Sequence, residues 1–185
     1  MDTHLSIDIE TLDVDPSPNA AIIAVGAVAF NEEEIIDQRE WLLNPVFSPG
    51  TRSYSTHKWW QEQEFEVAHR MFSGKVLPWD FCPEFSSFVG LNGCKQIWGF
   101  PIRFDVGHLR SLYRAVEHPF PLDFRAERDL STLYDLGKRY WSIPLDLLKE
   151  SLKREHREHD ALSDALYQAG LIQGLLQIVR AGSAG

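Results

Sequence analysis

The sequence predicts an α/β fold in which a mixed five-stranded sheet is flanked by helices. Two patterns indicate this class. Three strand-like apolar segments separated by polar turns lie before residue 44, and short strands alternate with amphipathic helices over the rest of the chain. The chain has 185 residues, 44% of them apolar and 24% charged, which is enough to bury a core. We expect one domain over residues 1–185.

The first strand, over residues 5–11, alternates apolar and acidic side chains. Alternate residues of a strand share a face, so Asp8 and Glu10 point the same way, roughly 7 Å apart, and the apolar residues point the other way. Such a pair is costly to bury unless a cation lies between the two carboxylates. Taken alone, the pattern is also that of an edge strand with a solvated acidic face.

Two more strands are expected to pair with the first. Residues 20–30 form a nearly unbroken apolar run, typical of a strand covered on both faces. A charged turn at 31–34 leads into a third strand at 35–43, which completes a hairpin-like meander. This pairing would place Asp8 and Glu10 near the centre of the sheet.

The remaining chain, after a loop at 44–54, contains helical patterns and two further short strands. From Asp105 onward, for example, apolar residues recur every three or four positions, the spacing of an amphipathic helix. Helices are expected at 56–71, 83–91, 105–116, 131–137, 145–153 and 160–180, and strands at 96–99 and 124–130.

The formal charge of −9 is concentrated at the beginning of the chain. The first 40 residues hold ten acids and one base, and seventeen of each sign follow. This balance disfavours a nucleic-acid-binding protein that relies on a broad basic surface. It allows a small basic track beside an acidic centre that metal ions neutralise.

The sequence gives no sign of a membrane or secreted protein. No apolar run approaches the ~20 residues that cross a bilayer, and the first residues lack the pattern of a signal peptide. We therefore expect a cytoplasmic protein without membrane contact. Cys82 and Cys94 form no C-x-x-C motif, so neither a zinc site nor a disulfide framework is implied.

Two more acids and a histidine fall where this fold could bring them to the first strand. Asp105 follows the strand expected at 96–99, and Asp164 lies early in the last helix, close to the small residues Ala161 and Ala165. Taken alone, each acid is better explained as a favourable charge near a helix start. His159 precedes Asp164 by five residues, roughly 140° on a regular helix, so the two cooperate only if His159 stands in the loop or first turn.

Together, Asp8-x-Glu10, Asp105, His159 and Asp164 resemble the exonuclease superfamily named for its Asp-Glu-Asp-Asp carboxylates, in the variant with a histidine (DEDDh). That variant includes ribonuclease T, oligoribonuclease and proofreading subunits. The sister variant has a tyrosine four residues before the last Asp and is excluded, because Asp160 stands there. Further likeness to the phage exodeoxyribonuclease and ribonuclease T-like 3′-exoribonuclease branch comes from residues 22–30, Trp59 with Trp60, and 128–130.

The resemblance implies a ribonuclease H-like fold and a metal-dependent 3′-to-5′ exonuclease. Its substrate would be single-stranded DNA or RNA with a free 3′ end, and its products nucleoside 5′-monophosphates. Two Mg²⁺ ions are expected, with Mn²⁺ able to substitute, since an all-carboxylate set suits hard cations. The implied metal ligands are Asp8, Glu10, Asp105 and Asp164. His159 is the implied general base, and His156 is a competing candidate.

The resemblance also suggests substrate contacts. Thr11 and Leu12 correspond to positions that contact the terminal nucleotide, and the backbone near Ile9 to one that reads the 3′ hydroxyl. Trp59 or Trp60 is expected to stack on a base, although at helical spacing one of the two should belong to the core. Candidate phosphate contacts are Lys58, Arg103 and Arg110.

Two other functions remain open. A hydrolase restricted to very short oligonucleotides, like oligoribonuclease, would carry the same motifs. A noncatalytic nucleic-acid-binding protein could keep the fold, although the presence of all five active positions argues against it. A homodimer is expected only by analogy with relatives. The loop at 100–104 is bulkier than in relatives and leaves the shape of the substrate entrance open.

Overall fold

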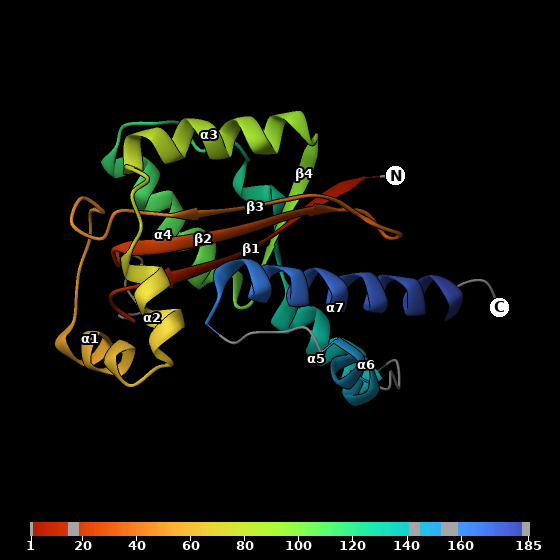
Figure 1. Ribbon diagram of the computed structural model, residues 1–185. Helices are drawn as coiled ribbons and strands as arrows, with labels where there is room; N and C mark the ends of the chain where they lie inside the picture. The colour runs from red at the N-terminus through yellow and green to blue at the C-terminus, as the bar shows by residue number, and fades with distance from the viewer. Residues whose placement is uncertain (1, 15–18, 141–144, 153–158, 183–185) are drawn as a thin grey trace.

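The computed structural model describes residues 2–14, 19–140, 145–152 and 159–182. Within these ranges the chain forms one five-stranded sheet in the order β3-β2-β1-β4-β5 (Figure 1). β1 lies at its centre, antiparallel to β2 and parallel to β4, which confirms the predicted mixed sheet. The strands are β1 (Thr3–Thr11), β2 (Ile22–Phe30), β3 (Ile35–Leu42), β4 (Cys94–Gly99) and β5 (Glu127–Asp129).

Helices cover both faces of this sheet. Figure 1 shows α3 (Pro78–Leu91) above it and α7 (Ala161–Gly182) below it. The apolar residues of β1 are buried in a core shared with α3 and α4 (Ile102–Ala115), whereas α5 (Leu130–Tyr140) and α6 (Leu145–Leu152) pack against α7. Asp8 points to the α7 side, as the hydrogen bond it accepts from Gln168 shows. The two faces of β1 therefore separate as the alternation predicts.

Several element boundaries differ from the predicted ones. The helix expected at 56–71 is two helices, α1 (Tyr54–Gln61) and α2 (Phe65–Phe72). Trp60 and Met71 share one buried cluster, whereas eleven residues of a single helix would separate them by about 16 Å. The break between α1 and α2 lets both side chains pack into the same cluster.

The predicted starts of α3 and α4 and the predicted bounds of the last strand also differ from the structure. α3 begins at Pro78 rather than at 83: Pro78 occupies the first helical position, which suits a proline, and Pro83 lies inside the helix. α4 begins at Ile102, three residues before the predicted start. The strand expected at 124–130 contains only β5, which a 3-10 turn at Phe124–Ala126 precedes and α5 directly follows.

The beginning of α7 lies unusually close to the sheet. A Cβ at Gly26 of β2 would lie 2.1 Å from the carbonyl oxygen of Ala161, so only glycine fits there. Ala161 and Ala165 are fully buried at this contact. Gly26 pairs with Asp8 across the sheet, so this approach carries the first turn of α7 over the acidic face of β1.

Both cysteines are buried free thiols, and burial raises the pKa of Cys82 and Cys94 to about 12. Among the described helices, none has the length and apolar character that a membrane span would need.

Gly26→Ala should destabilise the fold by about 1–3 kcal/mol or more, because the added methyl meets backbone atoms that cannot rotate away. For a chain of this size that corresponds to a fall in Tm of about 2–12 °C or more. Gly90→Ala is the matched control, since a Cβ at this exposed helical position meets nothing within 4 Å. We expect that control to be neutral or slightly stabilising. Equal thermal shifts in the two variants would contradict the close approach at Gly26.

Candidate active site

Carboxylates from β1 and α7 converge at one point of the sheet. Asp8 and Glu10 come from β1, and Asp164 lies in the first turn of α7. Each offers one oxygen, and these oxygens all lie within 4.8 Å of one another. Strand alternation and the close approach of α7 together produce this acidic cluster.

The protein around this cluster disfavours its negative charge. Burial and, to a smaller extent, the neighbouring carboxylates raise the pKa of Asp8 well above its ordinary value and that of Glu10 from 4.5 to about 8. A cation between the carboxylates would favour their ionised forms. Oxygen ligands suit hard divalent ions such as Mg²⁺ or Mn²⁺. The residues present therefore fit a divalent metal site.

Asp105 lies beside this cluster and is hydrogen-bonded to the end of β4. Its Oδ2 accepts from the Phe100 N–H at 3.0 Å, and a Cβ at Gly99 would lie 2.5 Å from the same oxygen. Burial raises the pKa of Asp105 to about 8. Among the described residues, the group of oxygens within 4.8 Å does not include Asp105. Its charge still raises the pKa of Asp8 and Glu10, so it acts on the same site.

Gln168 is a site residue that the sequence analysis missed. Its Nε2 donates a hydrogen bond to Asp8 Oδ1 at 2.8 Å, from a side chain that is buried under α7. This hydrogen bond orients the Asp8 carboxylate. Gln168 follows Asp164 by four residues and therefore shares its helix face, a spacing that the sequence offered as a signal.

His159 stands in a turn directly before α7, the placement that its predicted role requires. Its backbone is left-handed, with a φ of 63°, so the regular-helix angle to Asp164 does not apply. Its ring meets that of Trp59 edge to face, with 4.7 Å between the centroids. The competing candidate, His156, lies outside the described residues.

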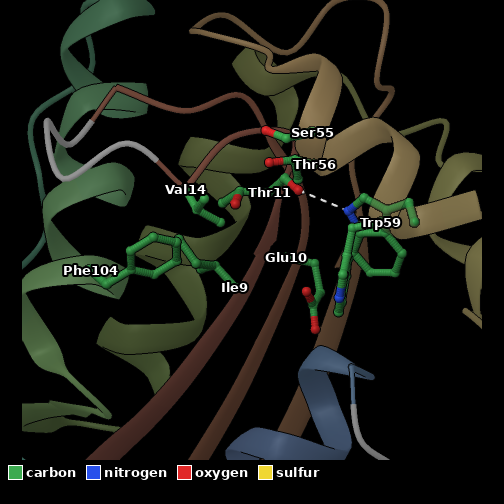
Figure 2. Close-up of a pocket in the computed structure, with 9 residues that line it drawn as sticks. Ile9, Glu10, Thr11, Val14, Ser55, Thr56, Trp59 and Phe104 are labelled. Atoms are coloured by element: carbon green, nitrogen blue, oxygen red, sulfur yellow. Dashed lines mark hydrogen bonds between the residues drawn. The ribbon is translucent and has the colours of Figure 1, made fainter. Parts of the chain in front are cut away.

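An open pocket of about 450 Å³ adjoins the acidic cluster at Glu10. Figure 2 shows Glu10 and Trp59 on one side of this pocket and Ile9 with Phe104 on the other. Most of the lining is apolar. The lining residues are Ile9, Glu10, Thr11, Val14, Ser55, Thr56, Trp59, Trp60 and Phe104.

The two adjacent tryptophans have different surroundings. Trp60 is 1% exposed, and its Nε1 donates a hydrogen bond to the carbonyl oxygen of Thr11 at 3.0 Å. Trp59 is 37% exposed, and its ring reaches the pocket. Leu12, another predicted substrate contact, is buried in the cluster that contains Trp60. Trp59 is therefore the tryptophan with a surface free to meet a ligand.

Pocket residues that the sequence did not single out come from three different segments. Val14 follows β1, Ser55 and Thr56 open α1, and Phe104 lies in the first turn of α4. The bulky segment at 100–104 therefore does shape the pocket, through Phe104. These segments are far apart in the sequence and meet only in the folded chain. No local sequence pattern therefore predicts that their residues share a pocket.

The predicted phosphate contacts lie in unequal surroundings. Arg110 is engaged within the fold, since its Nε donates to Glu127 at 2.8 Å and its Nη2 to the Leu122 carbonyl at 3.1 Å. Lys58 is exposed and lies 3.9 Å from Glu62. Arg103 is exposed at the start of α4. Lys58 and Arg103 are thus better placed than Arg110 to meet a phosphate.

The sheet order, the acidic cluster and the histidine before α7 bring together the features that the sequence shares with DEDDh exonucleases. Solved structures share the ribonuclease H-like fold. The nuclease domain of 3′hExo, described as a DEDDh family member bound to rAMP, aligns with a TM-score of 0.65 and 16% identity over 95% of this chain and 92% of that chain.

Two structures of exonuclease I are also similar in fold. A product-bound form aligns with a TM-score of 0.70 and 14% identity, covering 98% of this chain and 44% of that one. The E. coli enzyme in complex with a dT13 oligonucleotide aligns with a TM-score of 0.67 and 16% identity, covering 95% and 41%. This chain therefore spans less than half the length of exonuclease I.

The sequence itself identifies the family. Residues 3–176 match the family model described as a 3′-5′ exoribonuclease Rv2179c-like domain, and the chain belongs to that family. It is a 3′-5′ exonuclease. A search of curated proteins found no match.

The metal-free protein should lose stability as the pH rises from about 6.5 to about 8.5. Glu10 and Asp105 have folded-state pKa values of about 8, above their ordinary 4.5 and 3.8, so the folded state binds more protons across this interval. Each pKa unit corresponds to about 1.4 kcal/mol. We expect Tm in EDTA to fall by more than about 2–4 °C.

Added Mn²⁺ should remove most of this fall, because it favours the ionised carboxylates. Glu10→Gln should flatten the metal-free profile. A Tm that rises with pH in EDTA over the same interval would contradict the raised pKa values.

Proposed function

We propose that this chain removes nucleoside 5′-monophosphates from the 3′ end of single-stranded RNA. The observation that carries the proposal is the acidic cluster of Asp8, Glu10 and Asp164, which adjoins an aromatic pocket at Glu10. The family description supports RNA as the substrate. DNA is the alternative, supported by the dT13 oligonucleotide bound to exonuclease I.

Asp8, Glu10 and Asp164 would hold Mg²⁺, with Mn²⁺ able to replace it, and Asp105 would complete the set for a second ion. Divalent ions at such sites activate a water molecule and neutralise charge on the reacting phosphate. Gln168 keeps the Asp8 carboxylate oriented towards the cluster. Asp105 is held by the Phe100 N–H, so its carboxylate is pre-positioned before substrate arrives.

His159 would accept the proton of the attacking water through a ring nitrogen. Its position next to Trp59 supports this role, because Trp59 and Glu10 line the same pocket. A water molecule between the scissile phosphate and His159 would then lie close to the acidic cluster.

The pocket would hold the terminal nucleotide. Its volume of about 450 Å³ lies within the range of about 300–1,000 Å³ that is typical of small-ligand sites. Trp59 would stack on the base, a contact worth roughly 1–3 kcal/mol. The backbone at Ile9 and Thr11 would contact the sugar at the 3′ end.

One assay separates this function from its alternatives. RNA and DNA of several lengths, labelled at the 5′ end, are incubated with Mg²⁺ or with EDTA. We expect a ladder of RNA that shortens from the 3′ end only with Mg²⁺. Cleavage of only the shortest oligomers would favour an oligoribonuclease-like hydrolase, and retention without cleavage a binding protein. A cytoplasmic location and a homodimer stay predictions.

Asp164→Ala should reduce Mg²⁺-dependent cleavage to the background rate, because the cluster loses the ligand from α7. The fold should persist, since removal of one of several like charges relieves repulsion. Asp135→Ala on α5 is the matched control, an exposed helical carboxylate outside the cluster. Undiminished turnover by Asp164→Ala, with the same RNA and Mg²⁺, would refute the assignment of Asp164.

His159→Ala should lower kcat by about 10²–10⁴-fold, the range for loss of a proton-transfer group. Mn²⁺ binding, measured by calorimetry, should be retained, because His159 is not part of the acidic cluster. His69→Ala, at an exposed position of α2, is the control and should keep full activity. If His156→Ala shows the loss and His159→Ala does not, His156 is the general base.

A further inference from the structure

Arg70 of α2 connects the sheet to the beginning of α7. Its Nη2 contacts Glu40 of β3, and its Nη1 donates to Asp160 Oδ2 at 2.5 Å. The two acidic side chains are only 11% and 16% exposed, whereas that of Arg70 is 40% exposed. One guanidinium thus joins a residue of the sheet to the turn that contains His159.

The Glu40 end of this bridge is anchored close to the active site. Glu40 pairs with Gly26 across β2 and β3, and Gly26 pairs with Asp8 on the other side. Burial raises the pKa of Glu40, and the charge of Arg70 acts against that rise. Glu40 therefore gives Arg70 a partner that the sheet holds in place.

The Asp160 end controls how α7 begins. Asp160 Oδ1 accepts a hydrogen bond from the Ser163 N–H at 3.1 Å, and its carbonyl oxygen accepts from the Asp164 N–H at 2.8 Å. Asp160 also directly follows His159. The backbone φ of His159 is 63°, a left-handed value that is unfavourable for residues other than glycine. Such a conformation persists only where its surroundings hold it.

We propose that Arg70 is a positioning residue that holds the His159 turn in place for catalysis. It ties Asp160 to Glu40, while Trp59 of the neighbouring helix packs against the His159 ring. Figure 1 shows α2 beside the beginning of α7, where this bridge lies. The inference rests on the proposed role of His159 as the general base.

A double-mutant cycle tests whether Arg70 acts through His159. Arg70→Met alone should lower kcat by about 10–10²-fold, as small displacements of a catalytic group do, with KM and Mn²⁺ affinity nearly unchanged. In the His159→Ala background, Arg70→Met should cause no further loss, because effects on one catalytic unit are not additive. Arg39→Met is the matched control, since Arg39 pairs with Glu84 at 2.5 Å and has a similarly exposed side chain.

Two other outcomes of this cycle would contradict the inference. If Arg70→Met causes the same loss with and without His159, or no loss in either background, Arg70 does not act through His159, and the inference is wrong while the proposed function stands. If His159→Ala costs no activity, the proposed base is wrong, and this inference fails with it.

A second variant covers the case in which Arg70→Met does not fold. Asp160→Asn removes the charge that Arg70 contacts but keeps a side chain that caps a helix well. We expect Asp160→Asn to give the same pattern in the cycle, with a loss of kcat only when His159 is present. A loss of equal size in both backgrounds would overturn the inference.

Discussion

The close contact between the first turn of α7 and the middle of β2 is the constraint on which this site depends. Because residue 26 has no side chain, the helix can lie with the carbonyl of Ala161 almost against the sheet. Asp164 then reaches the face of β1 that carries Asp8 and Glu10. Sequence positions more than 150 residues apart thus meet through one glycine and two buried alanines.

This contact makes the site electrostatically unfavourable by itself. Carboxylates that burial and mutual repulsion drive towards protonation are tolerable when a divalent cation favours their charged forms. The packing of α7 against β2 therefore brings the carboxylates together and, by the same contact, favours the binding of a divalent cation between them. It also sets the position of the histidine turn, since His159 directly precedes the residue that caps α7.

The sequence predicted most of this arrangement because its strongest signals are local. Alternation in β1 placed Asp8 and Glu10 on one face, and the small residues of α7 indicated a close helix. What it missed depends on contacts across the fold: the hydrogen bond from Gln168 to Asp8, the entry of Phe104 into the pocket, and the break between α1 and α2 that lets Trp60 be buried. Periodicity also could not tell which tryptophan is buried. That depended on the hydrogen bond between Trp60 and Thr11.

The most direct test of the metal site is anomalous diffraction from crystals soaked in Mn²⁺. We expect a peak among the carboxylates of Asp8, Glu10 and Asp164, and its disappearance in crystals of an Asp164 variant. Mn²⁺ bound elsewhere on the molecule, with these carboxylates left without an ion, would contradict the proposed metal-dependent chemistry.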